Sequence, residues 1–416
     1  MAQVEGLGAR RAALNLLDAV LRQGRTVDSA AQGIKLPPQD AALAVAIAGE
    51  TLRRLPDLDA LIDSATRQRL PDDSKARMVL RLALAQKAGL GTPDHALVAT
   101  ALPLVDGGPR RLVHGVLGTL LRRGVSLPAA PTLPPDVEER WGRAWGEQAV
   151  LAARRAIGHR PPLDLSFAHD EAAKAYALGV SLAPRHRRIE HAGNVTELPG
   201  FGDGGWWVQD LAASLPARLI PTGASNVLDL CAAPGGKTMQ LAAVGYNVTA
   251  VDRSESRLAR LAENLARTGL KAELVAADAL EWTPPRAFDS ILLDAPCSAT
   301  GTFRRHPEVL YRARPTVIAE SADLQARLLD RAAAMLKPGG TLVYAVCSLE
   351  REEGEEVVSA FLEQRPKFRI EAPAPGELPD AVPSTRQGWA RILPGTIEEQ
   401  GGLDGFFVAR LVRAHA

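Results

Sequence analysis

Two cysteines stand where a thiol could act as a nucleophile. Cys297 comes three residues after the apolar run 290–294, and Cys347 ends the apolar run 341–347. If both runs are parallel strands of one sheet, the two thiols lie at the same sheet edge. A single free cysteine is most often a small buried apolar residue. Two thiols at strand ends favour nucleophilic use, because a thiolate can add to an electrophilic carbon and leave again.

The third cysteine opens a segment of small residues. CAAPGGKT at 231–238 follows the apolar run 227–230 and precedes a helical pattern. Small side chains let a ligand approach the backbone, and the start of the helix offers free N–H groups. The segment matches neither the Walker loop nor G-x-G-x-x-G. Cys231 itself is expected to be structural, through packing or a backbone contact to a ligand.

Acidic residues end three of the predicted strands. Asp252, Asp278 and Asp294 each close an apolar run after the small-residue turn. A carboxylate at the first position suits a ribose diol, and one at the second could accept from an adenine amino group. Each acid alone could be a helix cap or a solvated residue. Together with the turn, the three acids indicate a site for a nucleoside-type cofactor.

Basic residues cluster in two places. Arg304, Arg305 and His306 follow Cys297 closely and could hold a phosphate backbone, although a solvated loop is the alternative. A second cluster covers 185–188, where an RNA contact and a solvated surface are equally favoured.

The elements that must position these residues fall into three parts. Apolar residues at helical spacing fill 1–125 and predict an all-α bundle, with stripes near 40–54, 57–68, 75–89, 94–105 and 109–123. Four prolines between 125 and 135 predict a linker. The region 136–222 reads as a small α+β subdomain, with one helix over 141–159. From 223 to 416, strands alternate with helices, which predicts a doubly wound α/β domain with a mostly parallel sheet.

Four long motifs at these positions resemble those of the RNA 5-methylcytosine methyltransferases: LDLCAAPGGKT (228–238), AVDRS (250–254), LLDAPCSATGTFRRHPE (292–308) and LVYAVCSLEREEGEEVV (342–358). Within that family, the chain is similar to the branch that carries a NusB-like N-terminal helical domain and acts on small-subunit (16S) ribosomal RNA. The pair Gln209-Asp210 and the C-terminal segments 393–395 (LPG) and 404–407 (DGFF) belong to the same resemblance.

The resemblance implies a cofactor, a substrate and site residues. The cofactor would be S-adenosylmethionine on a Rossmann-like domain, and the partner would be 16S ribosomal RNA, bound in part by a NusB-like domain at 1–125. Cofactor-binding residues would be Cys231, Ala232, Ala233, Pro234, Gly235, Gly236, Lys237, Asp252, Asp278 and Asp294.

The resemblance also implies catalytic roles. Cys347 would attack C6 of cytosine, and Cys297 would assist release of the methylated base. Asp294 would hydrogen-bond the edge of the cytosine ring, and Lys237 would orient that site. DNA 5-methylcytosine methyltransferases instead use the cysteine of their Pro-Cys pair, here Cys297; the second Cys-Ser pair favours the RNA family.

The chain departs from the family pattern at two positions. Val346 stands where a threonine is usual before the nucleophile, and Ala213 stands where a serine is usual. Neither change removes a thiol or an acid of the site. The alternatives are a transfer RNA substrate and, in another class, a non-catalytic RNA-binding or antitermination protein built on the helical domain.

Composition limits the remaining possibilities. The net charge is +1, which argues against holding RNA by bulk charge, although residues 1–130 carry 17 Lys/Arg against 12 Asp/Glu. Three cysteines in 416 residues fit a reducing compartment and provide no regular zinc set. No apolar run is long enough to span a membrane. We therefore expect a cytoplasmic monomer that needs neither metal nor membrane.

Overall fold

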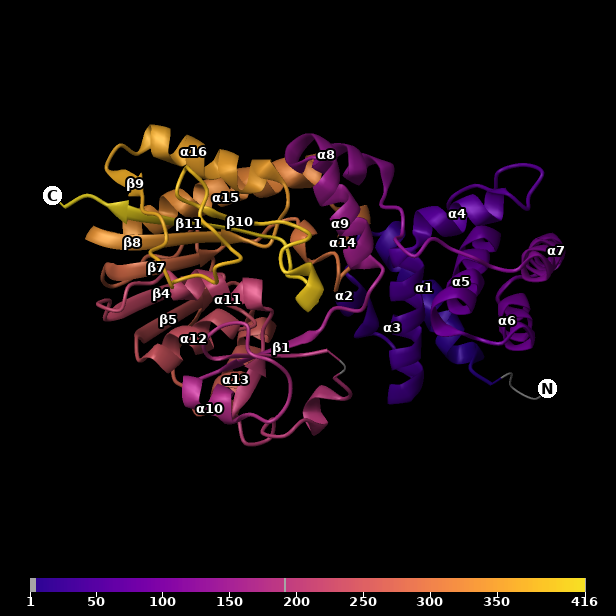
Figure 1. Ribbon diagram of the computed structural model, residues 1–416, viewed down its shortest axis with the longest axis horizontal. Helices are drawn as coiled ribbons and strands as arrows, with labels where there is room; N and C mark the ends of the chain where they lie inside the picture. The colour runs from indigo at the N-terminus through magenta and orange to yellow at the C-terminus, as the bar shows by residue number, and fades with distance from the viewer. Residues whose placement is uncertain (1–4, 191, 416) are drawn as a thin grey trace. The chain divides into compact units, whose positions relative to one another are not determined.

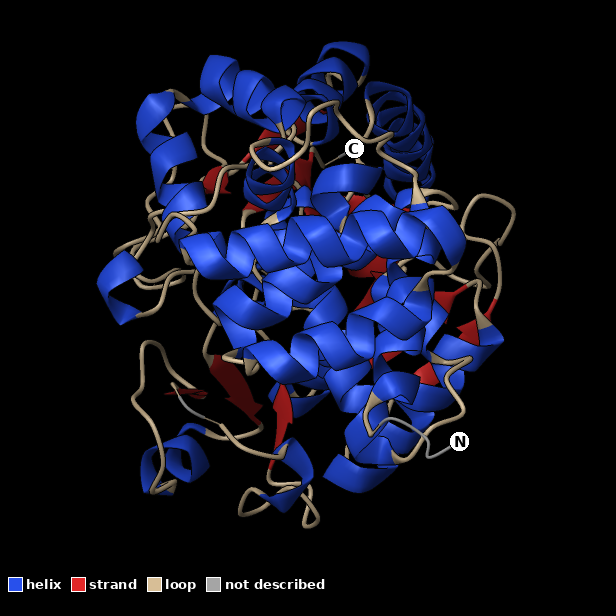
Figure 2. Ribbon diagram, turned by 90° about the vertical axis from the view of Figure 1, so that its right-hand side faces the viewer, coloured by secondary structure: helices blue, strands red, loops and turns tan. Residues whose placement is uncertain are grey.

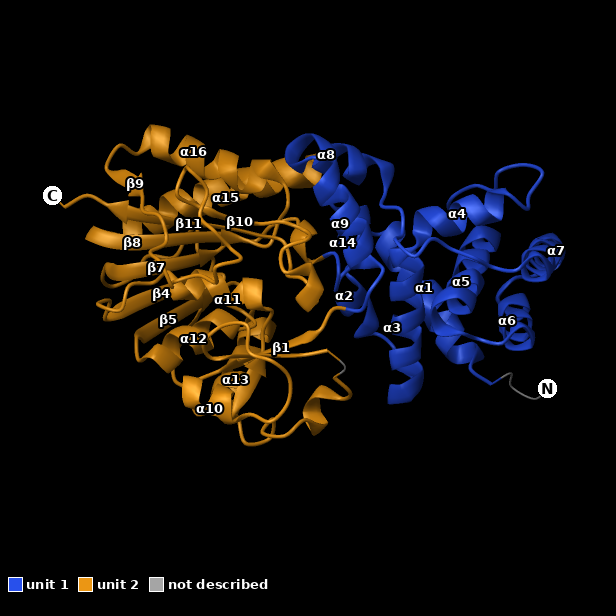
Figure 3. Ribbon diagram, viewed as in Figure 1, with its two compact units in different colours: residues 1–160, 303–313 blue, residues 161–302, 314–416 orange. Residues whose placement is uncertain are grey.

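The computed structural model describes residues 5–190 and 192–415 (Figure 1). The chain forms two compact units (Figure 3), of which the first comprises residues 1–160 and 303–313 and the second comprises 161–302 and 314–416. No helix in the described part of the chain is long and apolar enough to cross a membrane.

The described residues of the first unit form helices and loops without strands, as the sequence predicts. Helices are blue and strands red in Figure 2. The helices predicted within 1–125 are present, together with the short α2, which was not predicted. The α-helices of this unit are α1 (Leu7–Leu21), α2 (Val27–Ala31), α3 (Pro38–Arg53), α4 (Leu55–Asp63), α5 (Lys75–Leu90), α6 (Asp94–Ala101), α7 (Gly107–Arg123), α8 (Pro135–Trp145), α9 (Glu147–Ile157) and α14 (Val309–Arg312). Residues 125–134 of the predicted linker 125–135 contain no helix or strand, and its last residue, Pro135, begins α8.

Helix α5 is the centre of this bundle. It contacts α1, α3, α4, α6 and α7, and its residues from Ala76 to Gln86 are buried all around the helix. Two of these buried residues are arginines. Arg77 donates to Asp63 (Nη1–Oδ1 2.7 Å) and Asp59 (3.0 Å), and Arg81 donates to both oxygens of Asp59 (2.7 and 2.8 Å). The bond from Arg77 holds the pKa of Asp63 below its ordinary value.

The region 136–222 differs from the expectation in two ways. Helix formation stops at Gly146, whose φ of 83° lies in the left-handed region, so the one expected helix is two, α8 and α9. These helices group with the first unit, whereas residues 161–222 group with the second. There, β1 (Leu163–Phe167) pairs antiparallel with β2 (His186–Ile189) and β3 (Trp206–Val208), and α10 (Asp170–Ala175) lies between β1 and β2 in the chain.

The large sheet of the second unit has the order β10-β11-β8-β7-β4-β5-β6, with β9 beside β11. Neighbours from β6 to β8 are parallel, and β11 is antiparallel to β8, β9 and β10. The strands are β4 (Asn226–Leu230), β5 (Asn247–Asp252), β6 (Glu273–Ala276), β7 (Phe288–Asp294), β8 (Leu336–Val346), β9 (Phe368–Ile370), β10 (Ala390–Ile392) and β11 (Phe406–Arg413). Chain order reverses between β4 and β7, where ligands bind in such sheets, at the carboxyl ends of the strands.

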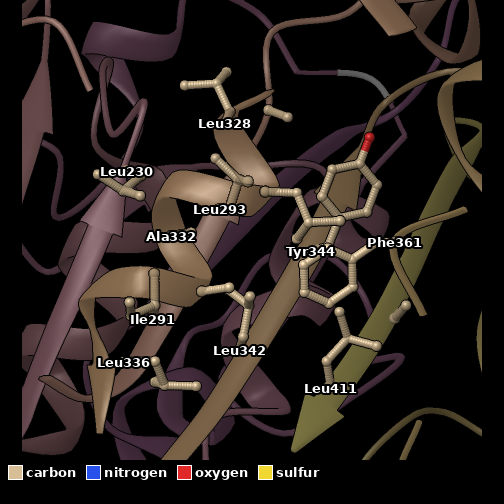
Figure 4. Close-up of a cluster of buried hydrophobic side chains, with 14 of the residues drawn as sticks. Leu230, Ile291, Leu293, Leu328, Ala332, Leu336, Leu342, Tyr344, Phe361 and Leu411 are labelled. Carbon is tan, nitrogen blue, oxygen red and sulfur yellow. The ribbon is translucent and has the colours of Figure 1, made fainter. Parts of the chain in front are cut away.

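Helices cover both faces of this sheet, which explains the continuous apolar runs of its strands. Ile291 and Leu293 pack with Leu342 and Tyr344 against α15 (Pro315–Met335) and α16 (Glu355–Gln364) in one core (Figure 4). Their alternating neighbours, such as Leu292, face a second core formed with α11 (Leu211–Arg218) and α12 (Gly236–Val244). Helix α13 (Glu255–Thr268) adds a further cluster beside β5. The α/β prediction for this domain is confirmed.

Replacing Arg77 by leucine should destabilise the helical unit. The change leaves Asp63 without its closest partner, whereas Asp59 keeps both hydrogen bonds from Arg81, and breaking a largely buried pair in this way costs about 3 kcal/mol. Hydrogen exchange of the α5 amides in the full chain would measure the loss. The control is Arg22→Leu, because Arg22 is half exposed in its pair with Asp18; that change should cost less than about 1 kcal/mol. Equal losses of protection in the two variants would contradict a stabilising role for the buried Arg77 ion pairs.

Candidate active site

The carboxyl ends of four parallel strands carry the predicted site residues. Asp252 and Asp294 are the last residues of β5 and β7. Cys231 directly follows β4, and Cys347 directly follows β8. Because these strands are parallel, the four residues lie along one edge of the sheet. Asp278 is farther out, since β6 already ends at Ala276 and Asp278 is exposed.

The small-residue turn at 231–236 has a backbone that larger residues could not adopt. Gly235, which precedes α12, has φ 106°, and a Cβ there would lie 2.0 Å from Leu261 Cδ1. Asp252 Oδ2 accepts from the Ala233 amide (3.1 Å), and Arg257 donates to the Ala233 carbonyl. Burial raises the pKa of the Cys231 thiol to about 12. The thiol therefore stays protonated, as a structural role requires.

Lys237 and Asp294 form an ion pair next to this turn. Lys237 Nζ lies 2.7 Å from Asp294 Oδ2 and 5.3 Å from the centre of the Phe406 ring. Burial alone would lower the pKa of Lys237, but the charge and hydrogen bond of Asp294 raise it above the ordinary value. The lysine thus stays charged and holds the carboxylate at the end of β7 in place.

The two candidate nucleophiles lie together. Cys297 Sγ is 3.5 Å from Cys347 Sγ, within hydrogen-bonding distance for sulfur. The hydrogen bond with Cys347, together with burial, raises the pKa of Cys297 well above its ordinary value. Cys297 therefore keeps its proton and can donate it toward the Cys347 sulfur.

Sequence reasoning missed a buried acid, Glu353, that binds the residues next to both thiols. Glu353 accepts hydrogen bonds from the hydroxyls of Ser298 and Ser348, the residues that follow Cys297 and Cys347. The sequence signal was an acidic residue shortly after the Cys-Ser pair, within the run EREEGEE, which also reads as a solvated charged segment.

The C-terminal DGFF segment closes the site from another strand. Gly405 N donates to Gly301 O (2.8 Å), and Gly301 N donates to Cys347 O (3.0 Å). A Cβ on Gly301 would lie 2.0 Å from Gly405 O, so this close approach needs glycine. Phe406, the first residue of β11, then lies beside Lys237.

The basic clusters differ from the expectation. Arg304 is only 3% exposed, which contradicts a direct contact of its guanidinium with an RNA phosphate, whereas Arg305 and His306 are partly exposed. In the second cluster, Arg188 is buried and binds both oxygens of Asp164 (2.7 Å each). Arg187 donates to backbone carbonyls, including Ala173 O (2.6 Å). Both side chains are structural there.

The turn and its acids fit a nucleoside-type cofactor. Asp229, wholly buried on β4, bonds Thr238 Oγ1 through Oδ2 (2.6 Å), but its Oδ1 has no partner among the described residues. Burial raises the pKa of Asp229 to about 7. Asp252 Oδ2 accepts from Ala233 N and lies 3.7 Å from Arg257 Nη1, whereas Oδ1 accepts one N–H, from Ser254, and keeps a second lone pair. This edge therefore offers unused acceptors beside a turn of small residues.

Comparisons with known proteins match both parts of the chain. A family model described as "16S rRNA methyltransferase RsmB/F" matches residues 216–412, and the NusB family matches residues 7–122. "Ribosomal RNA small subunit methyltransferase B" of Klebsiella pneumoniae (strain 342) is 33% identical over 98% of each chain. The protein of that name from Xylella fastidiosa is 34% identical, covering 98% of this chain and 99% of that one.

Solved structures agree on the fold. The crystal structure of PH0851 superposes with a TM-score of 0.74 over 98% of this chain and 99% of the other, at 23% identity. A methyltransferase homolog from Pyrococcus horikoshii has a TM-score of 0.54 at 28% identity, covering 71% of this chain and 98% of that one. The NusB-like and Rossmann-like fold predictions are confirmed.

Alkylation of the folded protein should separate the three thiols. At pH 8, a thiol of pKa about 12 is ionised in on the order of one molecule in ten thousand, so Cys231 should react very slowly with iodoacetamide. Cys297, which keeps its proton, should also react slowly. Alkylated Cys347 should therefore be the main product. Peptide mass spectrometry over time gives the three rates. Faster labelling of Cys231 or Cys297 than of Cys347 would contradict these proton positions.

Proposed function

The chain belongs to the RsmB/F family of 16S rRNA methyltransferases, and we propose that it methylates C5 of a cytosine in small-subunit ribosomal RNA through a covalent bond between Cys347 and C6. The observation that carries the proposal is the pair of thiols 3.5 Å apart at the strand ends, beside the Lys237–Asp294 ion pair. A protein that only binds RNA has no need of this arrangement.

Cys347 begins the reaction as a thiolate. Its sulfur adds to C6, the 5,6 double bond is lost, and C5 becomes a carbon nucleophile. Negative charge spreads onto the pyrimidine ring during this step. Asp294 accepts a hydrogen bond from the cytosine amino group at the ring edge, and the positive charge of Lys237, 2.7 Å from Asp294, offsets the carboxylate and the charge that develops on the ring.

Cys297 acts when the product leaves. After methylation, C5 releases its proton to water, the electrons of that C–H bond restore the 5,6 double bond, and the C6–S bond breaks with its electron pair going to sulfur. Cys347 departs as a thiolate. The Cys297 thiol, 3.5 Å away and still protonated, stabilises it through an S–H hydrogen bond.

S-adenosylmethionine would supply an electrophilic methyl group on a sulfonium. The residues that would hold it are the turn 231–237, Asp252 at the end of β5, Asp278 beyond β6, and Asp294. Asp252 would accept from the ribose hydroxyls and Asp278 from the adenine amino group.

The RNA must present its cytosine unstacked, because C6 is shielded within a helix. The NusB-like part, residues 1–125, would dock the RNA, and its excess of Lys/Arg over Asp/Glu suits phosphate contacts. Arg305 and His306 remain candidates for such contacts, since both are partly exposed. The near-neutral net charge implies local patches, so affinity should still fall with salt.

The test uses methyl-labelled S-adenosylmethionine, purified protein and unmodified 16S ribosomal RNA, with the product cytosines mapped. Cys347→Ala should abolish methyl transfer, because no other group takes over attack on C6, while calorimetry should find cofactor affinity unchanged within about twofold. Normal turnover by Cys347→Ala would end the covalent assignment. If only transfer RNA were labelled, the substrate would be transfer RNA and not 16S ribosomal RNA.

Cys297→Ala should allow attack but slow release. Alanine removes the S–H donor, so Cys347 is a poorer leaving group and the RNA–protein adduct should accumulate as a band that survives denaturation. The double variant Cys297→Ala/Cys347→Ala is the matched control and should form none. A Cys297→Ala enzyme that turns over normally, with no adduct, would remove Cys297 from the release step.

A further inference from the structure

Glu353 is a buried acid to which the proposed reaction assigns no part. It ends the short helix η4 (Arg351–Glu353) and is 0% exposed. A buried carboxylate is costly unless its oxygens are satisfied. Four donors converge on this one: Ser298 N (2.7 Å), Ser298 Oγ, Ser348 Oγ and Gln325 Nε2 (3.2 Å).

These donors belong to the two segments that carry the thiols. Ser298 directly follows Cys297 after β7, and Ser348 directly follows Cys347 after β8. The segments are 50 residues apart in the chain, and Glu353 joins them through one side chain. Their hydroxyls also lie 3.3 Å from each other.

A residue of another element holds the acid in place. Gln325 of α15 donates from Nε2 to Glu353 Oε1 and also to Pro296 O (2.9 Å), the residue before Cys297. Tyr344 of β8 donates from its hydroxyl to the Glu353 carbonyl (2.6 Å). The sheet, α15 and η4 thus meet at Glu353.

We infer that Glu353 is a positioning residue that fixes the separation of the Cys297 and Cys347 sulfur atoms by holding Ser298 and Ser348 on a single carboxylate. The inference rests on the proposed function for its effect on turnover, but the separation of the sulfurs is measurable without that function. The S–H hydrogen bond that stabilises the departing thiolate is lost once the two sulfurs drift beyond hydrogen-bonding distance, and a misplacement of about 1 Å costs on the order of 100-fold in rate.

Glu353→Gln is the informative change because it keeps the size of the side chain. The amide retains one acceptor oxygen and replaces the other by NH₂, which cannot accept from a serine hydroxyl or a backbone amide. With the amide nitrogen at the Oε2 position, both serine hydroxyls lose their acceptor, and with it at the Oε1 position the Ser298 backbone amide loses its own. Ser298→Ala and Ser348→Ala each remove one hydroxyl donor and leave the acid. The control is Ser290→Ala on β7, a buried serine whose hydroxyl has no partner among the described residues.

Steady-state methyl transfer to 16S ribosomal RNA is measured first, with kcat expressed per cofactor-binding site from calorimetry. Glu353→Gln should lower kcat about 10- to 100-fold while KM for RNA and cofactor affinity change less than about threefold. Each serine change should lower kcat less, and Ser290→Ala should match the wild type. Partial unfolding would lower the number of cofactor sites instead, which distinguishes a merely structural role. Wild-type kcat in Glu353→Gln would overturn the inference.

The sulfur separation is measured without RNA. Diamide, an azo oxidant, takes two electrons and two protons from the thiol pair, becomes the hydrazine and leaves an S–S bond, which peptide mapping assigns to Cys297–Cys347. The wild type should form this bond, and Glu353→Gln should form it about tenfold more slowly. Equal rates, or no bond in the wild type, would overturn the inference. A slowed bond with no methyl transfer in the wild type would support the positioning role and reject the proposed function alone.

Discussion

The parallel pairing of β7 with β8 is the constraint on which the rest of this site depends. Asp294 lies opposite Ala345 in the register, so the chain leaves both strands at the same edge and at nearly the same height. Cys297 and Cys347 follow within three residues, which brings two thiols from distant parts of the chain to 3.5 Å. A slip of one residue would turn the side chains of a strand to the opposite face and separate the site from its core.

Burial on both faces of the sheet makes that register stable. Ile291 and Leu293 face one core, and Leu292 faces the other. A change of register would therefore expose apolar side chains of β7 to water. The polar groups at the strand ends are then paired within the fold: Lys237 with Asp294, and Glu353 with two serines. Because each charge is held by partners from different elements, the site is rigid before substrate arrives, which is the condition for electrostatic stabilisation of a developing charge.

Much of the site could be predicted from sequence because it follows local rules. A small-residue turn after a strand, and acids or thiols at strand ends, are patterns of adjacent residues, and Asp252, Asp294 and Cys347 stand where those patterns place them. Glu353 could not be found this way, since its importance comes from Ser298 and Gln325, which only tertiary packing brings to it. The burial of Arg304 is equally a property of the folded chain.

The fold shows the same division. Periodicity predicted the helices of the first unit closely, but it missed the break at Gly146, where a left-handed backbone conformation ends α8 without disturbing the apolar pattern. In the region 136–222, short strands such as β3, of three residues, carry too few residues for a pattern. The three-part division into 1–125, 136–222 and 223–416 stays a prediction beside the two units of the structure.

The most direct test of the covalent account uses RNA in which cytosine carries fluorine at C5. After methylation, C5 has no proton to lose, so the bond between sulfur and C6 cannot break and the adduct persists. Peptide mapping of the wild-type protein cross-linked in this way should find the nucleotide on Cys347. A nucleotide on Cys297, or methyl transfer to unmodified RNA with no adduct on the fluorinated RNA, would contradict the account.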